Sequence, residues 1–237
     1  MTRFKLGLLA ALTVVVVMGV AVSSASAAAC KEEAGKGKFV LCLGEPLVLT
    51  EGTFTIHAET DSGATYRLHA NNSGLEVVCS AVSGLGALTS ATGVVSILNQ
   101  VLSFTTCKIP GLEEKCEVVE PILTEKLKGV IEEKVKNHIL FTPETGSVFA
   151  AFTIKSKAGQ TCLAAGVVKV TLLPGEKGGV LCESELAKTA LLHLLECTKE
   201  HSDLEAFGEV ATFEGKFNAK LLSHTGVEEK WAVIEGT

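Results

Sequence analysis

Residues 213–221 read FEGKFNAKL, and apolar or small residues alternate with polar ones throughout the stretch. One side of this pattern consists of Phe213, Gly215, Phe217, Ala219 and Leu221. A strand with one buried and one solvated face has this period of two, which is typical of antiparallel sheets. The stretch therefore predicts a half-buried antiparallel strand.

The same period recurs along the chain, at residues 53–58, 147–155 and 167–172. Clusters of turn-forming residues separate such runs at 61–63, 71–74, 143–146 and 174–179. The first cluster, Asp61-Ser62-Gly63, is predicted to be a hairpin turn between two alternating strands. Many short strands at this spacing predict an all-β fold, an antiparallel sandwich or barrel-like domain with disulfide staples.

Two segments fit a helix as well as a strand. In 183–207, one helical stripe would hold Leu186, Ala190, Leu191, Leu194 and Leu195, whereas Ala190, Leu192 and Leu194 also alternate as in a strand. One short helix is therefore an alternative there, although the neighbouring runs favour a strand. Segment 123–135 is ambiguous in the same way, but Gly129 in its middle weakens a helix.

The first 27 residues are predicted to be a signal peptide, and 28–237 a single secreted β-rich domain. Arg3 and Lys5 precede an apolar run over 6–22, and small residues follow it. Cleavage after Ala27 would leave no transmembrane segment in the mature chain. Lipid anchoring at Cys30 is the alternative, but it would leave seven cysteines and hence an unpaired thiol. A retained anchor helix over 6–22 is a third possibility.

Secretion makes the cysteines disulfide candidates, because thiols oxidise outside the cytosol. Local geometry favours pairing Cys107 with Cys116, since the intervening Ile109-Pro110-Gly111 can turn the chain back. A bridge between Cys30 and Cys42 would tie down the new N-terminus in the same manner. The full pairing stays open, because eight cysteines allow 105 combinations. The eight candidates are Cys30, Cys42, Cys79, Cys107, Cys116, Cys162, Cys182 and Cys197.

Charge and composition argue against several classes of ligand. After processing, 19 basic residues face 27 acidic ones, so the net charge is −8 and nucleic acid is an unfavourable partner. Asp61 and Asp203 are the only aspartates, which is too few for calcium loops of the EF-hand or nonapeptide-repeat kind. Arg67 is the only arginine left to grip phosphate or carboxylate groups. We predict no cofactor, no metal and no recognisable catalytic residue.

Two patterns that could carry chemistry have simpler interpretations. Asp61-Ser62-Gly63 with His57 superficially resembles the nucleophile turn of trypsin-like proteases, but the distant elements of a triad are missing. His193, Cys197 and His201 lie four residues apart, and on a helix they could bind zinc together with the preceding Cys182. The oxidising compartment favours disulfides at these cysteines instead.

Several short stretches carry a resemblance to a protein family. They are Phe104-Thr105-Thr106-Cys107 with Cys116, Leu127-Lys128-Gly129, Phe141-Thr142-Pro143-Glu144-Thr145-Gly146 with Phe149, and Leu204-Glu205-Ala206-Phe207-Gly208 with Ala211. Over about residues 75 to 215 the chain is similar to uncharacterised secreted β-rich proteins of high-GC Gram-positive soil bacteria. The chain departs from them in having more cysteines towards its C-terminus. The resemblance implies compartment and general shape, and it carries no assigned activity.

Two functions from different classes follow as hypotheses. The first is a non-catalytic secreted or cell-envelope-associated interaction or structural module, for which a cell-wall or extracellular protein is the class of partner that the compartment favours. The alternative is a secreted hydrolase whose site is assembled from scattered residues. A cleft that gathers two or more of His57, His69, His138, His193 and the glutamates within hydrogen-bond reach would favour the hydrolase.

Overall fold

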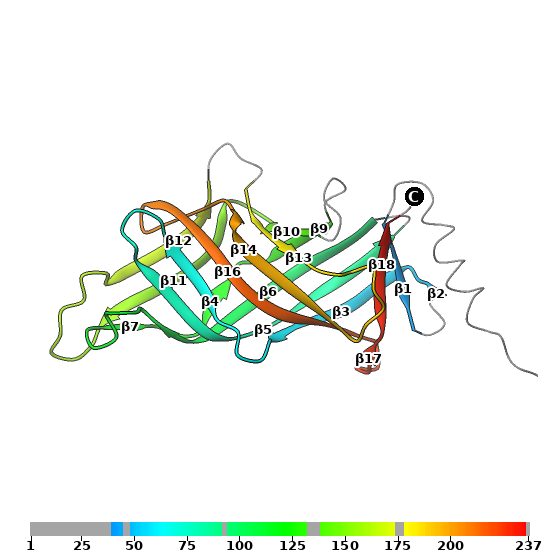
Figure 1. The fold of residues 1–237 in the computed structure, drawn as a ribbon, viewed down its shortest axis with the longest axis horizontal. Helices are drawn as coiled ribbons and strands as arrows, with labels where there is room; N and C mark the ends of the chain where they lie inside the picture. The colour runs from blue at the N-terminus through cyan, green and yellow to red at the C-terminus, as the bar shows by residue number, and fades with distance from the viewer. Residues whose placement is uncertain (1–38, 45–47, 92–93, 132–137, 174–177, 236–237) are drawn as a thin grey trace, which may run out of the picture.

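The computed structural model describes residues 39–44, 48–91, 94–131, 138–173 and 178–235, which form antiparallel strands without a helix (Figure 1). This confirms the predicted all-β class. The strands are β1 (Phe39–Leu43), β2 (Val48–Leu49), β3 (Gly52–Thr60), β4 (Tyr66–Ala70), β5 (Glu76–Ala91), β6 (Val94–Lys108), β7 (Cys116–Val118), β8 (Ile122–Thr124), β9 (Leu127–Ile131), β10 (His138–Pro143), β11 (Val148–Ser156), β12 (Gly166–Leu172), β13 (Val180–Glu183), β14 (Leu192–Ser202), β15 (Leu204–Ala206), β16 (Glu209–Leu222), β17 (Glu228–Glu229) and β18 (Trp231–Glu235).

Strands β3 to β17 belong to one 15-stranded sheet that closes on itself. At one end of the ring, hydrogen-bonded neighbours follow in the order β3, β5, β6, β9, β10, β13, β14 and β16, and β16 returns to β3. At the other end the order is β4, β5, β6, β8, β11, β12, β15 and β16, and β16 returns to β4. The fold is therefore the barrel-like form of the predicted class.

The two sets of eight strands are the two ends of one elongated ring, and each position around the ring is occupied at both ends. Strands β5, β6 and β16 have 16, 15 and 14 residues, so each runs through both ends. At the other positions the chain forms two consecutive strands in the same direction, for example β3 then β4, or β12 then β13. Figure 1 shows β7, β11 and β12 towards one end and β3 towards the other.

The predicted strand over 213–221 is confirmed within β16. Gly215, Phe217, Ala219 and Leu221 are buried and Phe213 is half-buried, whereas Lys216 on the other face is exposed. An eight-stranded ring is just wide enough for such side chains to fill it. The alternation predicted for 53–58, 147–155 and 167–172 is also found, except that a register shift buries Phe149 as well.

A small sheet of β18, β1 and β2 lies at the end of the ring near β3 (Figure 1). An isolated bridge between Ala190 and Trp231 joins it to the segment before β14. Trp231 is buried, and its ring centroid lies 4.1 Å from that of His193 on β14. These contacts attach the small sheet to the large one.

Three disulfides connect the described residues: Cys79–Cys107, Cys116–Cys162 and Cys182–Cys197. None of the cysteines that the structure describes is free. The bridges indicate an oxidising, extracellular type of environment. Among the described residues, no helix has the length and hydrophobicity that crossing a bilayer requires.

The predicted pairing of Cys107 with Cys116 is wrong. Cys79 and Cys107 lie directly opposite each other on β5 and β6, with Cα atoms 3.9 Å apart. The turn after β6 leads Cys116 into β7, which pairs with β11 and brings it near Cys162. Long-range register thus outweighs the local turn. The predicted bridge from Cys30 to Cys42 lies outside the described residues, because Cys30 does.

Two further predictions are settled by strand pairing. Asp61-Ser62-Gly63 does form a turn, with Gly63 at a φ of 75° and the Ala64 N–H donating to the Asp61 carbonyl at 3.1 Å. The turn is not a hairpin, however, because β3 and β4 both pair with β5 and β16 and not with each other. In segment 183–207 the strand interpretation is confirmed from Leu192 onward. Segment 123–135 forms strands as far as Ile131, and its remaining residues lie outside the described part.

Candidate functional site

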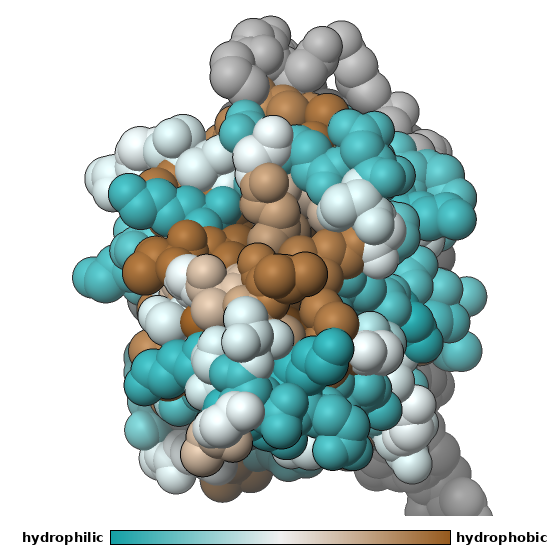
Figure 2. Space-filling model, turned by 90° about the vertical axis from the view of Figure 1, so that its left-hand side faces the viewer, coloured by the Kyte–Doolittle hydropathy of each residue, from teal (hydrophilic) through white to brown (hydrophobic). Residues whose placement is uncertain are grey.

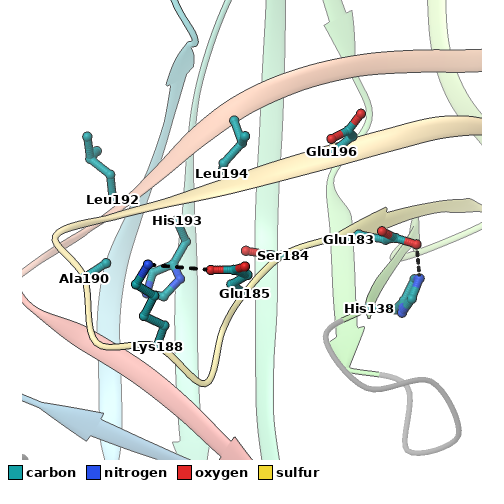
Figure 3. Close-up of a pocket in the computed structure, with 10 residues that line it drawn as sticks. All are labelled: His138, Glu183, Ser184, Glu185, Lys188, Ala190, Leu192, His193, Leu194 and Glu196. Atoms are coloured by element: carbon teal, nitrogen blue, oxygen red, sulfur yellow. Dashed lines mark hydrogen bonds and ion pairs between the residues drawn. The ribbon is translucent and has the colours of Figure 1, made fainter.

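A surface depression of ≈ 500 Å³ gathers two histidines and two carboxylates from β10, β13 and β14 (Figure 3). Strand pairing brings them together, since β13 lies between β10 and β14. The segment between β13 and β14 adds Ser184, Glu185 and Lys188. The ionisable groups from the strands themselves are His138, Glu183, His193 and Glu196.

Each carboxylate of the depression lies close to a basic group. His138 Nε2 lies 2.8 Å from Glu183 Oε1, and Lys188 Nζ lies 3.8 Å from Glu185 Oε2 (Figure 3). The third carboxylate, that of Glu196, lies 2.8 Å from the Lys216 ammonium on the neighbouring β16. The carboxylates of Glu185 and Glu196 are therefore paired with ammonium groups, and that of Glu183 is paired with an imidazole.

His193 is held below the surface and is only 3% exposed. Its Nε2 lies 3.0 Å from the carbonyl oxygen of Trp231. Burial lowers the pKa of His193, and hydrogen bonds to backbone groups of Trp231 and Glu185 only partly oppose this. Because a carbonyl only accepts hydrogen bonds, Nε2 carries the proton of the neutral ring. That nitrogen is therefore not free to act as a base.

Ser184 is the hydroxyl residue of the depression, and it is 6% exposed. Its Oγ has no hydrogen-bond partner among the described residues. A nucleophilic serine needs a base within hydrogen-bond reach, and neither imidazole of the depression fills this role in the described structure. The site thus brings two imidazoles and several glutamates together without forming a nucleophile–base pair.

Neither of the other two patterns assembles a site. Asp61 Oδ1 accepts a hydrogen bond from Asn218 Nδ2 at 3.2 Å, as a structural turn residue does. The zinc hypothesis is wrong, because Cys182 and Cys197 face each other across β13 and β14 and form a disulfide. Within the described residues, no group of three potential metal ligands comes together.

A second surface lies at the opposite end of the ring, where an open groove of ≈ 740 Å³ runs beside β12. Its walls are β12 with the segment before it, the turn between β4 and β5, and the turn between β15 and β16. Leu163 is 96% exposed and Val167 is 70% exposed. Figure 2, which views this end of the molecule, shows apolar residues at its centre and hydrophilic ones around them.

Sequence reasoning did not identify this groove. The run Leu163-Ala164-Ala165 after Cys162 is a weak signal, because a short apolar run usually enters a core. Only the pairing of β11 with β12 and of Cys116 with Cys162 places the run at the surface. In comparisons with known proteins, no protein-family model, no curated protein and no solved structure matches this chain.

Proposed function

We propose that the protein is a non-catalytic, secreted or cell-envelope-associated interaction module whose partner is another protein. The signal-peptide pattern of residues 1–27 and the three disulfides support export. The observation that carries the proposal is the exposed apolar surface at one end of the ring (Figure 2). Exposed apolar patches rimmed by polar residues are typical of protein-binding sites.

The test is capture of partners from the cell-wall fraction of the protein's own culture, with the mature chain as bait. Leu163→Asp places a charge on the apolar surface without disturbing the core, since this side chain is 96% exposed. We expect Leu163→Asp to abolish capture. The matched control is Val227→Asp, which charges an exposed valine in the turn before β17 and should leave capture unchanged. Equal capture by both variants would contradict the proposal.

A secreted hydrolase is the second candidate, because the depression on β13 and β14 does gather two histidines and several glutamates. In such an enzyme, the contact between His138 and Glu183 would serve general acid–base catalysis. A panel of ester, peptide and glycoside substrates tests it, with His138→Gln as the variant. Turnover that this variant abolishes would favour the hydrolase over the binding module.

A further inference from the structure

Strand β12 extends past its neighbour on one side. It pairs with β11 from Gly166, opposite Ile154, to Thr171, opposite Val148. On its other side it pairs with β15 at Thr171 and Leu172. No other described strand pairs with residues 166–170 there, and Figure 1 shows β12 reaching beyond the turn between β15 and β16. Among the strands that the structure describes, the ring therefore has an edge of five residues with no partner strand.

The direction of the backbone groups on this edge follows from two hydrogen bonds. The Leu172 N–H donates to Ser147 at 2.9 Å, on the β11 side, and the Leu173 N–H donates to Asp203 at 3.1 Å, on the β15 side. Backbone N–H and C=O groups alternate in direction along an antiparallel strand. Those of Val167 and Lys169 consequently point away from β11 and into the groove.

The walls of the groove beside this edge are fixed by hydrogen bonds and a disulfide. Glu209, the first residue of β16, accepts the backbone N–H of Asn72 at 2.6 Å and that of Ser73 at 3.1 Å. Hydrogen bonds from Ser73 first, and then from Asn72, keep the pKa of the Glu209 carboxyl below its usual range. On the other wall, the Cys116–Cys162 disulfide fixes the segment that carries Leu163.

We infer that an extended segment of a partner protein adds to β12 as a further strand along residues 166–170. This inference rests on the proposed function and specifies its site. Strand addition uses main-chain hydrogen bonds for affinity and alternate side chains for specificity. A groove of ≈ 740 Å³ lies within the size range of ligand sites, about 300–1,000 Å³.

The side chains around the edge define the chemistry of the partner. Leu75 and Phe207 are half-buried in the walls of the groove, so inward residues of the added strand are apolar. Lys169 is exposed on the outer face of β12, so the residue opposite it carries a carboxylate. A second copy of this edge fits less well, because residues 166–170 read GVVKV and contain no acid.

The probe is a capped nine-residue peptide that alternates valine with threonine, carries one central glutamate and bears a fluorescent label. Its binding to the disulfide-bonded mature protein is measured by fluorescence anisotropy. Val167→Pro removes one donor that points into the groove, and we expect it to weaken binding by about tenfold, the effect of one hydrogen bond. Val167→Ala keeps that N–H and is the matched control, which should bind nearly as well.

Charge is tested with Lys169→Glu, which should weaken binding of the glutamate peptide and strengthen binding of the same peptide with lysine at its centre. Peptides N-methylated along one edge or the other are tested on the unaltered protein, so the result does not depend on how Val167→Pro folds. One of the two should lose binding and the other should retain it. Equal binding of the two N-methylated peptides would overturn the inference. Equal binding of the unmodified peptide by Val167→Pro and by the unaltered protein would also overturn it.

Two further outcomes separate the inference from the proposed function. In the first outcome, the peptide does not bind, and Val167→Pro captures the same partner from the cell-wall fraction as the unaltered protein does. This would reject strand addition at β12 and retain the proposed binding module. Absence of both capture and peptide binding would reject both. A dimer in sedimentation experiments that Val167→Pro dissociates would show a second copy on this edge and would overturn the inferred partner.

Discussion

At the scale of single residues, large side chains in the interior of the ring pack closely against glycine. The Tyr66 ring lies over Gly215, and its hydroxyl donates to the Lys216 carbonyl at 2.8 Å. A Cβ atom at residue 215 would lie 2.6 Å from Cδ1 of Tyr66. The tyrosine also packs against Phe104, with ring centroids 5.5 Å apart. Glycine in the middle of β16 is therefore required by close packing.

Gly215→Ala should lower the free energy of unfolding by about 1–3 kcal/mol, the usual cost of overpacking a core. Urea denaturation of the variant measures the loss. In a Tyr66→Leu background the same substitution should cost markedly less, because the ring that it strikes is gone. Equal costs in the two backgrounds would contradict the role assigned to Tyr66.

His193 should make stability depend on pH. Its pKa is lowered in the folded protein by burial, so below pH ~6.5 the unfolded chain takes up a proton that the folded chain does not. Stability should then fall as the pH decreases from ~6.5 towards the lower folded-state pKa, and it should be constant above ~6.5 as far as this group is concerned. Urea denaturation between pH 5 and 8 measures this slope.

His193→Gln is the control, because its amide N–H can still donate to the Trp231 carbonyl while the side chain does not titrate. The difference in stability between the two proteins should vary with pH below ~6.5. A difference that is constant across this range would show that His193 is not the group responsible.

At the scale of elements, much of the strand content was predictable, because alternation depends on neighbouring residues only. The strands at 53–58, 167–172 and 213–221 follow from their period. Pairing was not predictable, because it depends on residues far apart in sequence. The same turn chemistry occurs at Asn71–Gly74, where β4 and β5 form a hairpin, and at Asp61–Gly63, where the chain continues in the same direction.

Two of the described disulfides, Cys79–Cys107 and Cys182–Cys197, belong to this scale because they connect strands that already pair. Replacing Cys79 and Cys107 together by serine should cost about 3–4 kcal/mol, the chain-entropy estimate for their separation of 28 residues. The reason is that the unfolded chain regains the conformations that the bridge excludes. Urea denaturation is the measurement, and Ser83→Ala on β5 is the control for a substitution in the same ladder. A loss no larger than that of Ser83→Ala would contradict the stapling role.

At the scale of the whole molecule, closure of the described strands into a ring leaves few of their backbone N–H and C=O groups available to pair with another chain. Strand β16 pairs with β14 and β15 on one side and with β3 and β4 on the other, so its backbone is used on both edges. Strand β12 differs, since residues 166–170 have a partner on the β11 side alone among the described strands. This contrast between β16 and β12 could not be predicted, because it depends on where β15 ends relative to β12.

Residue-resolved amide hydrogen exchange on the disulfide-bonded protein tests this account most directly. Closure predicts that the amides of β16 from Phe217 to Leu221 are protected at successive residues, because both edges are paired there. On β12, Val168 and Val170 should exchange slowly, while Val167 and Lys169 exchange rapidly. Fast exchange at alternate residues of this range of β16 would contradict closure of the ring, and slow exchange of Val167 and Lys169 in the free protein would contradict the open edge.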